Sequence, residues 1–158
     1  MIKEDYQIKG YKLNFLLILI CLISLNNYSQ SNMKKIINSK EAPEPVGPYN
    51  QAVLIDGTLY LSGQIALDPK TMEMDNISIE NETIRVLNNI NAVLREAGYD
   101  FNDIIKTTIF LTNMADFTVV NEIYGKKFSK ESAPARETVE VSGLPKNAKI
   151  EISVIAKK

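Results

Sequence analysis

The residues best suited to chemistry lie near the end of the chain, in the stretch SAPARETVEVSGLPKNAKIEISVIA at positions 132–156. Arg136 stands at the start of one strand-like run, directly after Pro134 and Ala135, and Glu151 lies in the next run. The planar guanidinium of an arginine binds both oxygens of a carboxylate at once, and a glutamate can hold a water molecule and accept its proton. On periodicity alone, however, each of the two residues is typical of a solvated surface.

The composition restricts the chemistry further. The chain has no histidine, which removes the commonest general base and metal ligand. Cys21 is the only cysteine, so an internal disulfide and a cysteine-rich zinc site are both excluded. The net charge of −1 lacks the basic excess that is typical of nucleic-acid binders. We therefore expect a site without metal or cofactor, built from Arg, Lys, Asp, Glu, Tyr, Ser, Thr or main-chain groups.

The beginning of the chain forms a separate segment. Residues 13–25, LNFLLILICLISL, are apolar and uncharged, and Lys9 and Lys12 precede them. A basic flank, a short apolar run and a polar exit are typical of a secretory signal, and the run is short for a membrane span of about 20 residues. We expect residues 1–32 to be a signal segment of an exported, periplasmic protein. The alternative is translation from Met33, which would give a cytoplasmic protein.

The rest of the chain, 33–158, is expected to form one domain. Asp56-Gly57 between two apolar runs predicts a hairpin. The spacing of apolar residues predicts helices within 78–100 and 115–128, with a strand rich in β-branched residues over 103–113 between them. The two closing runs are interpreted as a second hairpin. The order ββαβαββ indicates an α+β fold, with two helices covering one face of a mixed sheet.

Alternation in the closing strands predicts which side chains share a face. Ile150, Ile152 and Val154 are expected to face the helices, as are Val139 and Val141. The opposite face is then expected to carry the polar side chains of both strands, namely Arg136, Thr138, Glu140, Glu151 and Ser153. That face should meet either water or another subunit.

Several segments together resemble the Rid family (reactive intermediate deaminase, also called YjgF), and its RidA branch in particular. The segments are EAPEPVGPYNQAV, LYLSGQIALDPKTME, DIIKTTIFLTNMADFTVVNEIYGKKF, PAR and LPKNAKIEISVIA, in the family's order. They extend across nearly the whole expected domain, so the resemblance is far more specific than any single motif. Residues 1–32 fall outside it.

The resemblance implies a fold similar to the trimeric chorismate mutases and a homotrimer with clefts between subunits. It implies hydrolysis of 2-imino acids, such as 2-iminobutanoate and 2-iminopropanoate, or of their enamine tautomers, to 2-keto acids and ammonia. By motif position, Arg136 and the main-chain N–H of Gly63 would bind the substrate carboxylate, Tyr49 would face the imine, and Glu151 would place the water. Three further positions would lie at the cleft: Ser62, Asn121 and Thr138, the last through its main-chain carbonyl.

Two departures and two alternative functions remain. RidA proteins often carry cysteine where this chain has Thr138, and a small residue where it has Glu137, which should point away from Arg136. The chain could instead be a non-catalytic binding protein or chaperone that uses the same clefts. A ribonuclease or translation inhibitor is disfavoured by the lack of histidine and of basic charge. Export would favour an imine or carbonyl substrate other than the usual cytoplasmic imines.

Overall fold

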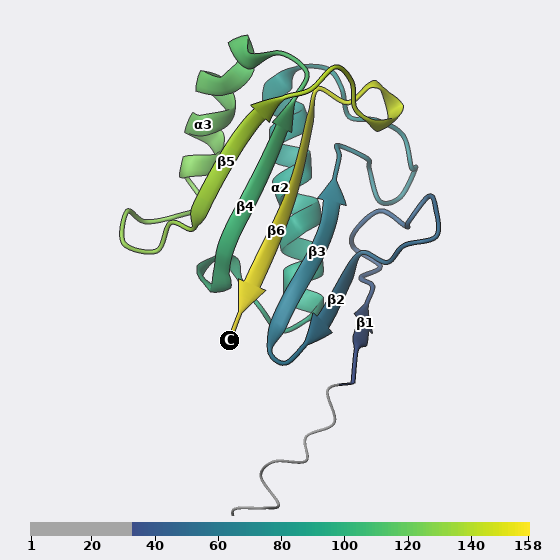
Figure 1. Cartoon of the computed structure of the whole chain (residues 1–158). Coiled ribbons are helices and arrows are strands. Elements are labelled where there is room, and N and C mark those ends of the chain that lie inside the picture. The colour runs from purple at the N-terminus through teal and green to yellow at the C-terminus, as the bar shows by residue number, and fades with distance from the viewer. Residues whose placement is uncertain (1–32) are drawn as a thin grey trace, which may run out of the picture. The chain divides into compact units, whose positions relative to one another are not determined.

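The computed structural model describes residues 33–158, of which Lys34–Lys158 form one compact unit. The expected signal segment, residues 1–32, lies outside the described residues, so that prediction is not tested. A single six-stranded sheet runs through the domain in the order β1-β2-β3-β6-β4-β5 (Figure 1). Among residues 33–158, no helix combines the length and apolar character that a membrane crossing needs.

The α+β fold class expected from the sequence is confirmed, with one short strand added at the start. The strands are β1 (Lys35–Ile37), β2 (Ala52–Ile55), β3 (Thr58–Gln64), β4 (Ile104–Leu111), β5 (Ala135–Glu140) and β6 (Ile150–Lys157). The helices are α2 (Ile79–Glu96) and α3 (Phe117–Gly125), with 3-10 turns at Phe101–Asp103, Met114–Asp116 and Pro145–Asn147. All neighbouring strands are antiparallel except β4 and β5, which are parallel.

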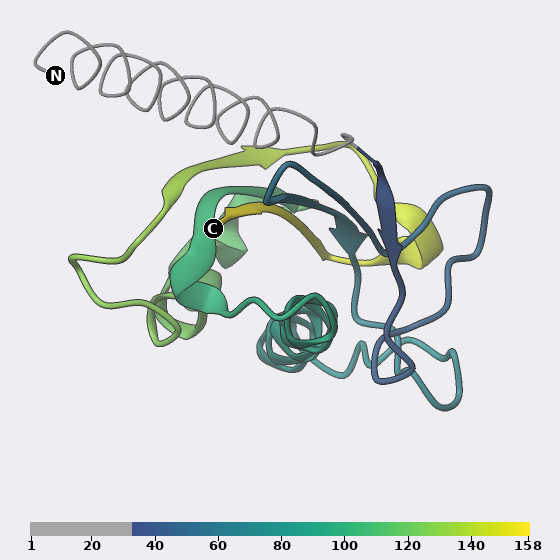
Figure 2. The same cartoon turned by 90° about the horizontal axis from the view of Figure 1, so that it is seen from below.

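Both helices cover the same face of the sheet, as the view along the strands shows (Figure 2). The core lies between them and the sheet. It is formed by Val86, Leu87, Ile90, Val93 and Leu94 of α2 and Val120 of α3, with Ile109, Leu111, Ile150 and Ile152 of the sheet. The opposite face, which we call the open face, has no helix over it within the described domain.

Local chemistry explains the element boundaries. Asp56 and Gly57 have φ of 49° and 66°, so the turn between β2 and β3 is left-handed at both positions and matches the twist of the strands. The side chain of Ser78 accepts the N–H of Asn81 and caps the start of α2. Gly98, with φ of 78°, follows its end.

The prediction of a closing hairpin is wrong. β4 lies between β5 and β6, because β5 pairs parallel with β4 while β6 pairs antiparallel with both β3 and β4. The chain leaves β4, passes through α3 and returns as β5 beside β4, which is the crossover that a parallel pair requires. A short loop between two strands does not by itself determine which strands pair.

The prediction of one shared polar face is also wrong. Arg136, Thr138 and Glu140 stand in register with Thr107, Ile109 and Leu111 of β4, which are all buried beneath the helices. These three β5 residues therefore point to the helix side of the sheet. Glu151 stands in register with Phe110 and, with Ser153, belongs to the open face.

The reason for the difference is the position of β5 at the edge of the sheet. The helix side of an edge strand is only partly covered, so a long polar side chain such as that of Arg136 reaches solvent there. Val139 instead lies on the open face, where its side chain is 39% exposed. The sequence therefore predicts correctly which β5 side chains share a face, but it assigns each of the two sets to the wrong face of the sheet.

Candidate functional site

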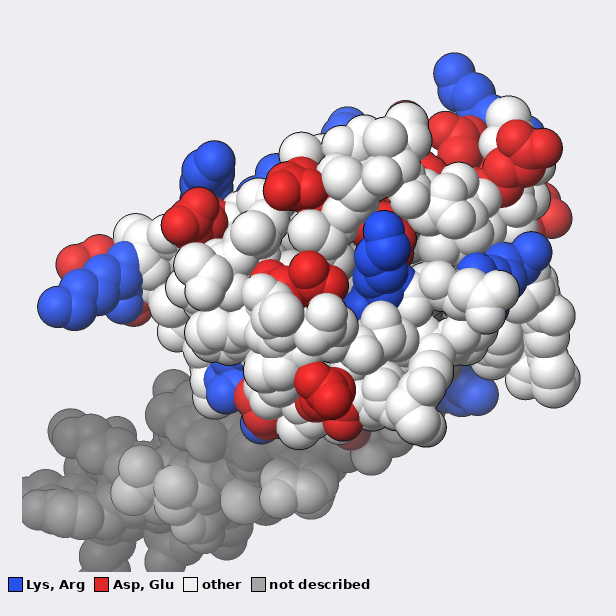
Figure 3. All heavy atoms as spheres, turned by 90° about the horizontal axis from the view of Figure 1, so that it is seen from above, with Lys and Arg blue, Asp and Glu red and all other residues white. Residues whose placement is uncertain are grey.

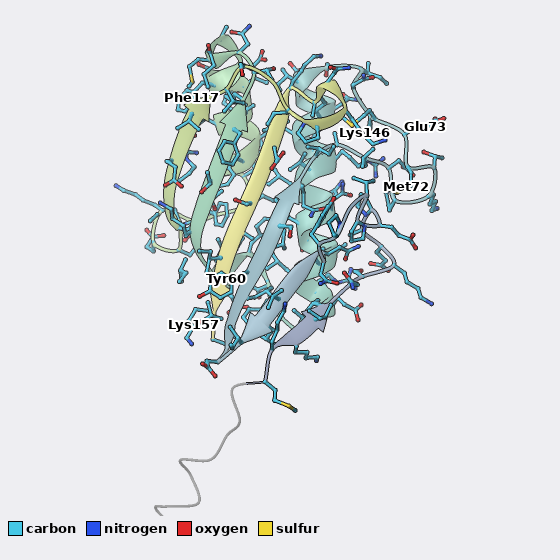
Figure 4. The ribbon with its side chains drawn as sticks, turned by 45° about the vertical axis from the view of Figure 1, so that its right-hand side comes forward. Tyr60, Met72, Glu73, Phe117, Lys146 and Lys157 are labelled. Atoms are coloured by element: carbon cyan, nitrogen blue, oxygen red, sulfur yellow. The ribbon has the colours of Figure 1, made fainter. Side chains whose placement is uncertain are left out.

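A cavity of about 340 Å³ opens beside the end of β3 and the start of β6. Four of the predicted site residues line it: Tyr49, Ser62, Gly63 and Glu151. Lys146 lines it as well, from the turn that precedes β6, and Figure 4 shows this residue at the same end of the domain as the loop of Met72 and Glu73. We call this group of residues the glutamate half-site.

Gly63 and Glu151 are in direct contact in this half-site. A Cβ atom placed on Gly63 would lie 2.0 Å from Oε1 and 2.7 Å from Cδ of Glu151. The register of β3 and β6 passes from Leu61 and Val154 to Gln64 and Ile152, so Ser62 and Gly63 form a bulge beside the carboxylate. This close approach of the carboxylate therefore requires glycine at position 63, because a Cβ there would force the Glu151 side chain to move.

Burial raises the pKa of the Glu151 carboxyl above its usual value. The cause is desolvation, since taking a carboxylate out of water disfavours its charged form. A raised pKa brings a carboxylate closer to the pH at which it works well as a proton acceptor and donor. The environment of Glu151 thus suits a group that holds and activates a water molecule, which is the role that the family resemblance implies for it.

A buried amide holds the loop that carries Tyr49. Gln51 is 2% exposed, accepts the N–H of Ser39 at 2.6 Å and donates to the carbonyls of Ser39, Ala42 and Pro43. The Tyr49 ring is 46% exposed and its hydroxyl accepts the N–H of Val46 at 3.3 Å. Sequence reasoning missed Gln51, since one glutamine in a strand-like run carries no signal of burial.

Ser62 has a structural role in this loop. Its hydroxyl donates to the carbonyl of Asn50 at 2.8 Å, and its N–H donates to the carbonyl of Gln51 at 2.9 Å. The side chain was predicted to lie at the substrate site, and it does line the cavity. Because the Ser62 hydroxyl donates its hydrogen to Asn50, it links the loop of Tyr49 to the bulge in β3.

Arg136 lies in a second group, between β5 and α3, which we call the arginine half-site. Its guanidinium carbon is 5.1 Å from the centre of the Tyr124 ring and 5.9 Å from that of Phe117. In Figure 4, Phe117 and Lys146 are labelled at the same end of the domain, Phe117 to the left of the strands and Lys146 to the right. No carboxylate of residues 33–158 forms an ion pair with Arg136, in contrast to Arg85, which contacts Asp68 and Asp75.

Asn121 and Thr138 belong to the arginine half-site. Asn121 is exposed and follows Phe117 by four residues, so it shares the stripe of α3 that faces the guanidinium. Thr138 points to the same side of β5 as Arg136, and its Oγ1 is buried without a hydrogen-bond partner among residues 33–158. The side chain of Glu137 points away from Arg136, as expected, and accepts hydrogen bonds from Lys106 and Thr108 on the open face. Those bonds hold the pKa of Glu137 below its usual value.

One chain does not bring the two half-sites together. Arg136 and Glu151 lie on opposite faces of the sheet, on strands that are separated by β4 and thus stand about 10 Å apart. A small substrate cannot contact both within one subunit. Within the described domain, no group of acidic, cysteine or histidine side chains is arranged to hold a metal ion.

Charge on the surface is mixed. Seen from above, acidic and basic side chains are interspersed and no broad basic area covers this face (Figure 3). Nucleic-acid binding usually depends on such an area.

Comparison with known proteins identifies the family. The family model described as endoribonuclease L-PSP matches residues 39–158. The chain belongs to the Rid family. A RutC family protein of Saccharolobus solfataricus is 51% identical to this Rid-family chain over 126 residues, covering 80% of the chain and 99% of the relative. The human 2-iminobutanoate/2-iminopropanoate deaminase is 41% identical over 126 residues, covering 80% of the chain and 91% of the human protein.

Solved structures agree with the fold of this Rid-family domain. YyfA of Yersinia pestis, a conserved Rid-family protein of unknown function, is 48% identical with a TM-score of 0.77, covering 80% of the chain and all of that structure (100%). TdcF of E. coli, solved with bound serine, is 38% identical with a TM-score of 0.74, covering 78% of the chain and 98% of that structure.

Proposed function

We propose that the protein hydrolyses 2-imino acids, or their enamine tautomers, to 2-keto acids and ammonia in clefts between the subunits of a homotrimer. The observation that carries the proposal is the split of the site: an arginine free of carboxylate partners in the described domain on one face, and a half-buried glutamate against a glycine bulge on the other. The human relative is named for the same reaction on 2-iminobutanoate and 2-iminopropanoate.

The chemistry needs few groups because an imine carbon is already electrophilic. Arg136 would bind the substrate carboxylate in a bidentate contact, with the Gly63 N–H as a second donor. Glu151 would accept a proton from water as the water oxygen bonds to the imine carbon, and would return it to the nitrogen to give a carbinolamine. Glu151 would then take the proton of the new hydroxyl and pass it to the same nitrogen as the C–N bond breaks. Ammonia leaves, a 2-keto acid remains and Glu151 ends in its starting state.

A neighbouring subunit would complete the cleft. The open face carries large side chains that water would otherwise reach: Tyr60, which Figure 4 labels, is 49% exposed, and Val139 is 39% exposed. A copy of the chain packed there would bury them and could bring its own arginine half-site to the glutamate half-site. Covering the cleft would also lower the local dielectric and strengthen the contact between Arg136 and the carboxylate.

Mixing two inactive variants tests the shared cleft. Arg136→Ala and Glu151→Gln should each abolish the accelerated decay of 2-iminopropanoate generated in situ. If the variants are unfolded and refolded together in equal amounts, about a quarter of the clefts receive both intact residues, because each cleft takes one from either chain. Activity near a quarter of the parent value is expected. Failure of the mixed trimers to recover activity would refute the shared cleft, and a parent without activity would refute the deaminase.

A non-catalytic binding protein is the second candidate, supported by the serine bound to TdcF. Serine carries the α-carboxylate that Arg136 suits, but it lacks an imine. If the parent binds serine in calorimetry and leaves the decay of 2-iminopropanoate unchanged, the binding function replaces the deaminase. The nuclease in the description of the family model gains no support from a chain without histidine.

We also propose that the protein is exported, from the apolar run at 13–25 behind Lys9 and Lys12. The substrate would then be an imine or carbonyl compound that arises outside the cytoplasm. Cell fractionation with mass spectrometry of the mature N-terminus tests this. A cytoplasmic product that begins at Met33 would overturn it.

A further inference from the structure

The side chain of Arg136 rests on aromatic rings where a carboxylate would ordinarily pair with it. The guanidinium lies over Tyr124 at 5.1 Å and over Phe117 at 5.9 Å, both within the range of cation–π contacts. Tyr124 and Phe117 stand two turns apart on α3, and the centre of the guanidinium lies over both rings. Two aromatic rings thus restrain the Arg136 side chain.

The Tyr124 ring is itself fixed from three sides. Its side chain is 5% exposed, and its hydroxyl lies 3.0 Å from Oγ1 of Thr107. Its ring packs on Phe128 at 4.8 Å between centres. Thr107 is also the residue of β4 that stands in register with Arg136. The ring, the threonine and the arginine therefore form one connected unit across α3, β4 and β5.

Contact with aromatic rings leaves the N–H donors of Arg136 without a carboxylate partner among residues 33–158. All five N–H donors of an arginine lie in the guanidinium plane, and a substrate carboxylate binds there. A protein carboxylate at those donors would compete with the substrate, whereas an aromatic ring restrains the side chain without occupying a donor. Restraint before binding reduces the conformational entropy that a long, exposed side chain loses when it binds a ligand.

We propose that Tyr124 is a positioning residue that orients Arg136 for the substrate carboxylate, with Phe117 as a second, more distant ring beside the guanidinium. The proposal rests on the function proposed above, in which Arg136 binds that carboxylate. Because this contact is present in both the bound substrate and the transition state, loss of the ring should act mainly on KM.

Two substitutions at Tyr124 distinguish the contribution of its aromatic ring from that of its hydroxyl. Tyr124→Leu should raise KM by about two- to twelve-fold, the cost of ordering one long side chain on binding, while kcat stays close to the parent value. Tyr124→Phe keeps the ring and should restore KM to the parent value. Phe117→Leu changes an exposed position of α3 and should raise KM less, because that ring lies farther from the guanidinium.

Tyr99 is the matched control. It is 7% exposed, its hydroxyl donates to the carbonyl of Gly57 at 3.0 Å, and its ring lies 5.0 Å from Nζ of Lys158. Tyr99→Leu therefore removes the same kinds of contact away from both half-sites. It should lower Tm to a similar extent as Tyr124→Leu and leave KM unchanged. An equal rise of KM in both variants would overturn the proposal.

A double-mutant cycle tests whether Tyr124 acts through Arg136. In an Arg136→Ala background, Tyr124→Leu should produce no further loss in affinity for serine, measured by calorimetry, because the residue that it orients is absent. A loss of the same size in both backgrounds would show that the ring supports the fold or contacts the ligand directly.

An NMR spectrum of the protein without ligand separates failure of this proposal from failure of the proposed function. The chain has three arginines, so the Nε–H signal of Arg136 can be assigned with Arg136→Lys. In the parent and in Tyr124→Phe this signal should be displaced by the ring current, and in Tyr124→Leu it should move to the position of a solvated arginine. An unchanged signal would refute the positioning role even in an active deaminase, and a displaced signal in a protein that neither binds nor hydrolyses would refute only the function.

Discussion

A methyl group added at Gly63 should damage catalysis far more than it damages the fold. In Gly63→Ala the new Cβ would stand 2.0 Å from Oε1 of Glu151, while contacts below 3.0 Å are essentially absent from real structures, so the carboxylate must move by at least 1.0 Å. A displacement of this size at a reacting group lowers activity by about a hundredfold. Overpacking at the same place should cost about 1–3 kcal/mol of stability, which a folded domain can tolerate.

The assay is the decay of 2-iminopropanoate generated in situ, together with the thermal unfolding of each variant. Gly143→Ala is the matched control, since a Cβ there meets no atom within 4 Å and its φ lies outside the left-handed region. It should leave both kcat/KM and Tm close to the parent. If Gly63→Ala folds and keeps parental kcat/KM, then the position of the Glu151 carboxylate does not limit the reaction, and its role as the water-placing group is refuted.

Two further predictions concern carboxylates. Because burial raises the folded-state pKa of Glu151 above 4.5, its ionised form costs stability at neutral pH. Glu151→Gln should therefore have a Tm at least as high as that of the parent at pH 7, and the difference should vanish as pH falls through the raised pKa; a lower Tm for the variant at pH 7 would contradict the burial argument. Glu82 is fully buried and its Oε2 accepts the N–H of Lys149 at 2.8 Å, so Glu82→Leu should lose about 1–3 kcal/mol in urea unfolding. Glu82→Gln retains an acceptor and should lose less, and equal losses would show that this hydrogen bond is not what stabilises the turn before β6.

The sequence by itself determined the local elements of this protein. Asp56 and Gly57 specify a left-handed turn, the apolar spacing specifies α2 and α3, and Gly98 specifies the end of α2, because turn chemistry and helical period depend on neighbours in the chain. The resemblance of several ordered segments to one family also named Gly63 and Glu151, which the structure places in contact.

Only the tertiary structure decided how these elements combine. Strand pairing depends on residues far apart in sequence. The sequence therefore predicted that side chains alternate along β5, but it could not predict which strand pairs with β5 or which of its two faces meets the helices. An edge strand with polar side chains in alternate positions gives no signal of which side meets the helices. The placement of Arg136 over Tyr124, and its separation from Glu151 within one chain, follow from the register of β5 against Thr107. That register brings together three segments that no local pattern connects.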